Sequence, residues 1–242
     1  MTRKRGKKVA LFIVIGIVVV LTVLFLSFMS MMKKQSANED PTYWEKDIKK
    51  IEARYEGKKP NVDMVFIGSS SIRKWVSLES DMAPYKVVNH GFGGSKVQDS
   101  TYYYDRLVTP FKPEVIVFFA GTNDINGIEG ISKSGEEVFE KVKEFYEKSQ
   151  SILPDVPVYY ISISPTKARW KAWEDAKTAN ELIEEYANTQ KMLTMIDTTD
   201  ELLNGEGLPN EELFVFDKLH LNEEGYKLWN SIIRPIVTES ME

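Results

Sequence analysis

The feature that most restricts the fold is an alternation of short apolar runs with longer amphipathic stretches, which begins near residue 43. Five apolar runs are predicted to be buried strands, at residues 62–67, 86–89, 115–119, 158–162 and 193–196. Helical patterns cover residues 43–55, 71–78, 97–107, 135–152 and 172–190. A last helix is expected from an Asn222 cap to about Arg234, before Pro235. This alternation predicts an α/β fold with parallel strands, right-handed crossovers and helices on both faces of the sheet.

A run without any charged side chain, residues 9–32, precedes this region. As a helix it would be about 36 Å long, which exceeds the roughly 30 Å of a bilayer core. Five basic residues lie among the first eight, so the N-terminus is expected in the cytoplasm and the rest outside the membrane. A cleaved signal peptide is the alternative, although the run is long for one and ends without a small-x-small pattern. The sequence therefore predicts a single-pass membrane protein with an uncleaved signal-anchor helix, or else a secreted one.

The sequence divides into a basic flank (1–8), the transmembrane helix (9–32), a polar linker (33–41) and a globular domain (42–242). The composition of these parts limits the partners and cofactors that the protein can have. Beyond the flank the chain carries 26 basic and 36 acidic residues, which argues against nucleic acid as a partner. The absence of cysteine excludes disulfides and thiolate metal sites. With only His90 and His220 as histidines, no metal and no other cofactor is predicted.

Polar residues follow the first and second predicted strands, at the edge where open parallel sheets place their sites. Gly68–Ser71 holds three consecutive serines, and one of them at a strand-to-helix turn could act as a nucleophile. Such serines are more often helix caps, and the register between Ser69, Ser70 and Ser71 stays open, with Ser70 favoured. The glycine-rich Asn89–Gly94 allows close backbone approach to a ligand, but it matches neither a phosphate loop nor a dinucleotide fingerprint.

Two further segments complete the set of candidate residues. Gly121–Asp124 follows the third strand, where an asparagine side chain could donate to the same site, although such turns are commonly structural. Asp217–His220 precedes the last helix and spaces a carboxylate three residues from an imidazole. A carboxylate can orient a histidine base and stabilise its charged form, so the pKa of His220 is expected near 6.5 or above.

Taken together, the four segments resemble the SGNH hydrolases, also called GDSL-like lipases or acylhydrolases, over about residues 62–237. The resemblance implies a three-layer α/β/α sandwich with a five-stranded parallel sheet, as in flavodoxin-like folds. It implies Ser70 as nucleophile, His220 as general base and Asp217 as the residue that orients it. The implied oxyanion hole consists of the Ser70 and Gly94 backbone and the Asn123 side chain. One departure is Ser69, which stands where the family's Gly-Asp-Ser has aspartate.

The predicted function is a serine esterase that cleaves an ester, of a short acyl group and a polar alcohol such as a glycan, through an acyl-enzyme. The alternative is a non-catalytic module on the cell surface that binds a glycan or a lipid. Trp170 and Trp173 are candidates for substrate binding, because they follow the end of the fourth strand. Arg169 beside them could bind an anionic group, although a solvated surface arginine is the commoner case. His90 is expected to be structural or exposed at the rim of the site, and Asp124 is expected to fix a loop.

Overall fold

The computed structural model describes residues 2–57, 60–239 and 241, with side chains from residue 15 onward except 28, 29 and 32. The chain divides into two units, Met1–Glu39 and Asp40–Glu242, and the first contains helix α1 (Thr2–Ser36). Among the described residues, no helix is both long and apolar enough to cross a membrane. The predicted transmembrane segment 9–32 includes residues 9–14, 28, 29 and 32, whose side chains lie outside this description.

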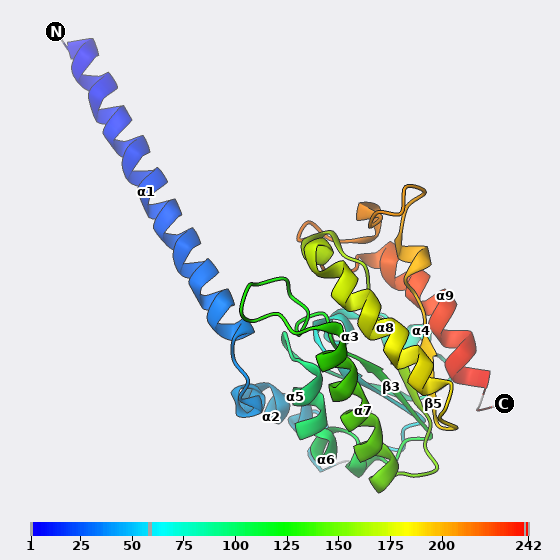
Figure 1. The fold of residues 1–242 in the computed structure, drawn as a ribbon. Helices are drawn as coiled ribbons and strands as arrows, with labels where there is room; N and C mark the ends of the chain where they lie inside the picture. The colour runs from blue at the N-terminus through cyan, green and yellow to red at the C-terminus, as the bar shows by residue number, and fades with distance from the viewer. Residues whose placement is uncertain (1, 58–59, 240, 242) are drawn as a thin grey trace. The chain divides into compact units, whose positions relative to one another are not determined.

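The second unit is built around one five-stranded sheet in which every pair of neighbouring strands is parallel (Figure 1). The strands are β1 (Met64–Gly68), β2 (Val87–Gly91), β3 (Val115–Phe119), β4 (Val158–Ile161) and β5 (Leu193–Ile196), in the order β2-β1-β3-β4-β5. Each begins and ends within two residues of its predicted range. The predicted parallel α/β fold is confirmed, and its strand order is that of flavodoxin-like proteins.

Helices cover both faces of the sheet, as predicted. They are α2 (Glu45–Ala53), α3 (Ser70–Lys74), α4 (Leu78–Asp81), α5 (Val97–Tyr102), α6 (Tyr104–Leu107), α7 (Gly135–Ile152), α8 (Trp173–Ala187) and α9 (Glu223–Glu239). Short 3-10 turns lie between them, namely η1 (Pro41–Trp44), η2 (Thr109–Phe111), η3 (Lys167–Ala172), η4 (Asp200–Leu202) and η5 (Glu211–Leu213).

Alternate strand residues supply two separate hydrophobic cores, because successive side chains of a strand point to opposite faces. Ile116 and Phe118 of β3 pack in one core with residues of α2, α5, α6, α7 and α8. Val117 and Phe119 pack in the other core with residues of α3, α4 and α9. Figure 1 shows α7 and α8 crossing one face of the sheet, with α9 set apart from them. Both faces of every central strand are therefore buried from solvent, which explains the nearly unbroken apolar runs in the sequence.

The last helix corrects one detail of the sequence prediction. α9 does not end before Pro235 but continues through it to Glu239. Proline removes a backbone donor and normally interrupts a helix. Here Ile233 and Val237, on either side of the proline, are fully buried in the second core. Burial of two such side chains stabilises by about 3–6 kcal/mol, which is enough to offset the roughly 3 kcal/mol cost of the proline.

A glycine lets the ends of β1 and β3 approach each other closely. Gly68 has φ of 143°, and a Cβ at this position would lie 2.0 Å from the carbonyl oxygen of Phe119. The same oxygen accepts a hydrogen bond of 2.9 Å from the backbone N–H of Ser69. Only glycine combines this backbone conformation with this approach, so Gly68 fixes where the chain leaves β1.

We expect Gly68→Ala to lower the free energy of unfolding by about 3 kcal/mol or more, because it adds both backbone strain and a steric clash. Urea unfolding of the full chain, followed by tryptophan fluorescence, measures this loss. Gly205→Ala is the matched control, since nothing lies within 4 Å of a Cβ there and its φ is not positive. Equal stabilities of the two variants would contradict the role of Gly68.

Candidate active site

Ser70 is the first residue of α3 and follows directly from the carboxyl end of β1. Two side chains hold this short helix in place. Asn89 donates from Nδ2 to the carbonyl oxygen of Ile72 at 2.6 Å, and Tyr226 donates from its hydroxyl to the carbonyl oxygen of Ser71 at 2.8 Å. Since α3 is tied to both β2 and α9, the position of the Ser70 hydroxyl is fixed by the fold.

The structure brings together three of the predicted residues in one hydrogen-bonded chain. The Ser70 hydroxyl lies 2.9 Å from Nε2 of His220, and Nδ1 of His220 lies 2.7 Å from Oδ2 of Asp217. Of the three consecutive serines, Ser70 is the one whose hydroxyl contacts the imidazole. Its side chain is buried apart from about 9% of its surface.

The loop that carries Asp217 and His220 is a tight turn held by its own carboxylate. Oδ1 of Asp217 accepts the backbone N–H groups of Leu219 and His220, each at 3.0 Å. Lys218 between them adopts a left-handed conformation with φ of 55°, which is uncommon for a residue other than glycine. The backbone N–H of Ala168 in η3 donates to the carbonyl oxygen of Lys218 at 3.1 Å. The turn is therefore anchored from inside and from the neighbouring segment.

The electrostatics of the site differ from the sequence expectation for His220. Burial lowers the pKa of His220 below 6.5 and outweighs the hydrogen bond that the imidazole donates to Asp217, which raises the pKa, while the nearby Lys74 and Arg73 lower it further. The expected upward shift is therefore not found, because the sequence analysis left out burial. Burial alone would raise the pKa of Asp217, but the backbone N–H and imidazole of His220 and the backbone N–H of Leu219 lower it to about 2.

Lys74 is a member of this site that the sequence analysis missed. Its Nζ lies 4.0 Å from Oδ2 of Asp217, on the side chain that also contacts His220. The spacing held a usable signal, since Lys74 follows Ser70 by four residues and such pairs share one face of a helix. The sequence predicted this helix only from residue 71, so Ser70 and Lys74 were not recognised as a pair on one helix face.

The loops that follow β2 and β3 are joined by two side chains of the second loop. Asn123 donates from Nδ2 to the carbonyl oxygen of Ser95 at 3.0 Å, and Asp124 accepts the backbone N–H of Val97 at 3.2 Å. Asp124 therefore fixes a loop, as predicted. Gly94 lies half-buried in the turn that these bonds hold. Of the two N–H groups of the Asn123 amide, the second has no partner among the described residues.

The remaining sequence candidates lie outside this hydrogen-bonded group. Trp170 and Trp173 stack on each other with ring centroids 5.9 Å apart, in η3 and at the start of α8. No interaction within the described part of the chain joins either ring to Ser70 or His220. His90 is fully buried and contacts the carbonyl oxygen of Leu107 at 2.6 Å, so it is structural, as predicted. Burial lowers its pKa to about 4.

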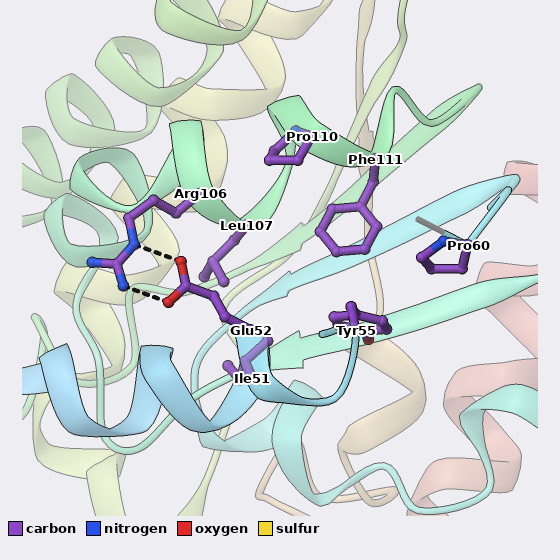
Figure 2. Close-up of a pocket in the computed structure, with 8 residues that line it drawn as sticks. All are labelled: Ile51, Glu52, Tyr55, Pro60, Arg106, Leu107, Pro110 and Phe111. Atoms are coloured by element: carbon purple, nitrogen blue, oxygen red, sulfur yellow. Dashed lines mark hydrogen bonds and ion pairs between the residues drawn. The ribbon is translucent and has the colours of Figure 1, made fainter. Parts of the chain in front are cut away.

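A separate pocket of about 210 Å³ lies on the α2 and α6 side of the unit. Figure 2 shows an ion pair between Arg106 and Glu52 at one end and the rings of Tyr55 and Phe111 at the other. Arg106 donates to Glu52 at 2.6 and 2.8 Å. None of the residues that line the pocket pairs a nucleophile with a base, so the chemistry belongs to the strand ends and not to this pocket.

A serine, a histidine and an aspartate joined in this order at the carboxyl edge of a parallel sheet define the arrangement of a serine hydrolase. The chain belongs to the GDSL-like lipase/acylhydrolase family, whose model matches residues 66–228. That family is the one that the four sequence segments resemble, and membership makes the chain a hydrolytic enzyme that acts on esters. A search of the curated proteins finds no match.

Solved structures share the fold at low sequence identity. A Streptococcus pneumonia protein provisionally named for platelet activating factor is 18% identical, with 81% of this chain and 95% of that chain covered and a TM-score of 0.69. A GDSL-like lipase from Bacteroides thetaiotaomicron is 18% identical, with 80% and 98% covered and a TM-score of 0.66. A carbohydrate esterase family 3 protein from Talaromyces cellulolyticus is 16% identical, with 74% and 97% covered and a TM-score of 0.58.

We expect an NMR titration of the two histidine rings to give a pKa below 6.5 for His220 and a lower one, about 4, for the more deeply buried His90. Lys74→Gln should raise the pKa of His220, because it removes a positive charge that disfavours the imidazolium. His90 serves as an internal reference that should not move. A His220 pKa above 6.5, or one that falls in the variant, would contradict this electrostatic account.

Proposed function

We propose that the protein is a serine esterase in which Ser70 is the nucleophile, His220 the general base and Asp217 the residue that orients the base. The observation that carries the proposal is the continuous hydrogen-bonded chain, 2.9 Å from the serine to the imidazole and 2.7 Å from the imidazole to the carboxylate. A nucleophile within hydrogen-bond reach of a base, with the base oriented by a third group, is the geometric signature of covalent catalysis.

In this mechanism Nε2 of His220 takes the proton of the Ser70 hydroxyl as its oxygen attacks the ester carbonyl. The other ring proton stays on Nδ1, which donates a hydrogen bond to the carboxylate of Asp217, and this bond stabilises the imidazolium as it forms. The imidazolium protonates the departing alcohol, and an acyl-enzyme remains on Ser70. Water, activated by the same imidazole, releases the acid and restores the hydroxyl.

The negative charge on the carbonyl oxygen would be bound by the backbone N–H groups of Ser70 and Gly94 and by the Asn123 amide. Ser70 stands in the first turn of α3, where backbone N–H groups lack partners within the helix. The bond from Asn123 to Ser95 orients the amide and leaves its second N–H for this task. One such donor typically lowers the barrier by about 3 kcal/mol.

For the substrate we propose an ester of a short acyl group with a polar alcohol, such as a hydroxyl of a glycan. The sequence holds no long apolar lid segment beyond the N-terminal run, which disfavours a long acyl chain. Proteins of similar fold are named a carbohydrate esterase from Talaromyces cellulolyticus and an acetyl xylan esterase, and these names agree with that class.

The proposed function predicts that Ser70→Ala abolishes ester hydrolysis, with a loss of about 10⁴-fold or more, and leaves the fold intact. Hydrolysis of an acetyl ester and labelling by a fluorophosphonate probe both measure it. Ser69→Ala and Ser71→Ala are matched controls that should still be labelled, since the hydroxyl that contacts His220 is that of Ser70.

If labelling survives in Ser70→Ala and disappears in one of the two controls, the serine replaced in that control is the nucleophile. Wild-type protein that neither reacts with the probe nor hydrolyses any acyl ester would favour the non-catalytic binding module instead.

We also propose that the N-terminal segment anchors the enzyme in the cell membrane, with the catalytic unit outside the cytoplasm. The support comes from the sequence, in which five basic residues precede the uncharged run 9–32 and two lysines follow it closely. A tether of this kind would hold the esterase beside polymers of the cell envelope.

Protease added to intact cells should therefore degrade the catalytic unit, and fractionation should recover the uncleaved chain with the membrane. A cytoplasmic protein expressed in the same cells is the control for lysis. Protection of the catalytic unit would contradict the topology, whereas a soluble secreted product beginning near residue 30 would contradict only the anchor.

A further inference from the structure

Arg169 carries a partly buried charge with no counter-ion in the described part of the chain. Its Nη1 makes one long hydrogen bond, 3.3 Å, to the carbonyl oxygen of Asn126. Its Nε is buried and has no hydrogen-bond partner, and no described carboxylate forms an ion pair with it. The sequence analysis favoured a solvated surface arginine, and this is wrong. Burial lowers the pKa of the guanidinium, which means that the fold holds it at an energetic cost.

The position of Arg169 connects it to both halves of the active site. Asn126, which accepts the arginine's hydrogen bond, donates from Nδ2 to the carbonyl oxygen of Asn123 at 3.0 Å. On the other side, Ala168 donates its backbone N–H to Lys218, in the turn between Asp217 and His220. Arg169 therefore stands between the loop of the proposed oxyanion donor and the loop of the proposed base.

Three buried hydroxyl groups without partners lie on the loop that carries Asn123 and on the segment that leads into Arg169. The buried hydroxyls of Thr122, Ser164 and Thr166 have no hydrogen-bond partner among the described residues, and each residue is more than nine-tenths buried. Thr122 follows β3, and Ser164 and Thr166 follow β4. The two segments touch, because a Cβ on Gly121 would lie 2.7 Å from the side chain of Ile163. Buried polar groups normally have hydrogen-bond partners, so three unpaired hydroxyls in the segments that adjoin Arg169 and Asn126 are unusual for a region that only supports the fold.

Stability alone does not account for this arrangement. The one hydrogen bond to Asn126 could be made by a neutral side chain, which would avoid the cost of desolvating a charge. An arginine that is unpaired in the protein but presents a fork of donors suits the oxygens of a carboxylate or a phosphate. The residue as a whole is only partly buried, so a ligand can approach it from solvent.

We propose that Arg169 determines specificity by binding an anionic group, a carboxylate or a phosphate, on the ester substrate. This inference rests on the proposed esterase function and narrows its substrate class from polar esters to negatively charged ones.

The test compares acetyl esters that differ in charge, namely 4-nitrophenyl acetate and its carboxylate- and phosphate-bearing analogues. For each ester, kcat/KM of Arg169→Gln is divided by that of the wild type, which cancels the intrinsic reactivity of the ester. A 4-nitrophenyl hemisuccinate places the charge on the acyl side instead. Lys167→Gln, in the same 3-10 turn, removes an equal but exposed charge that pairs with Glu211, and it is the matched control.

We expect Arg169→Gln to reduce kcat/KM about tenfold more for at least one anionic ester than for the neutral ester. The free energy of a hydrogen bond to a charged group is large enough to produce a change of that size. Lys167→Gln should affect all esters alike. An equal loss for charged and neutral esters would show a structural role and overturn the proposal. The analogue with the largest loss identifies the anion and the side of the ester that carries it.

A second measurement does not depend on the folding of any variant. At constant ionic strength, inorganic phosphate or succinate should inhibit hydrolysis of the neutral ester by the wild type competitively, and absence of inhibition by both anions would contradict the proposal. Neutral-ester hydrolysis that requires Ser70 but shows neither effect would leave the esterase standing and remove the anion site. Absence of hydrolysis of every ester would instead remove the proposed function.

Discussion

The contact between the ends of β1 and β3 is the constraint on which the site depends. Gly68 and the carbonyl oxygen of Phe119 lie too close for any side chain, and Ser69 donates to that same oxygen. In the order β2-β1-β3-β4-β5 the chain moves outward from β1 to β2 and then returns past β1 to β3. Loops that leave β1 and β3 therefore turn to opposite faces, and this switch point is where open α/β sheets place their ligands. Ser70 follows one of these strands and Asn123 the other.

From that point outward, the site is held by hydrogen bonds between loops and not by the strands themselves. Asn123 and Asp124 tie the loop after β3 to the segment after β2, while Asn89 and Tyr226 tie α3 to β2 and α9. None of these four side chains needs to react in order to matter. They reduce the freedom of the reacting groups before a substrate binds, and preorganised donors cost no rearrangement at the transition state.

The sequence predicted the sheet well and the details of the site unevenly, for physical reasons. Strand β3 was placed to the residue because both faces of a central strand are apolar, a signal that is local in the sequence. The end of α9 was misplaced because burial of Ile233 and Val237 is a tertiary effect that outweighs Pro235. Ser70 could be favoured over Ser69 and Ser71 only through a resemblance, since register depends on where His220 lies in space. The burial of Arg169 and His220 had no signal in the sequence at all.

The charges around His220 divide its two protonation states between different parts of the site. Burial, Lys74 and Arg73 disfavour the imidazolium, so the neutral form of the imidazole persists to lower pH than in a free histidine. Asp217, whose own pKa is lowered to about 2, is ionised at neutral pH and favours the imidazolium.

In the resting protein, burial and the two positive charges prevail over the effect of Asp217, and the pKa of His220 is lowered. In the proposed mechanism Ser70 gives up its proton, negative charge develops beside the imidazole, and the balance moves toward the protonated form. An interaction that grows stronger during the reaction lowers the barrier, whereas one of equal strength in both states does not. The pairing of a disfavoured resting imidazolium with a permanently charged Asp217 is therefore consistent with catalysis and would serve no purpose in a histidine that only supports the fold.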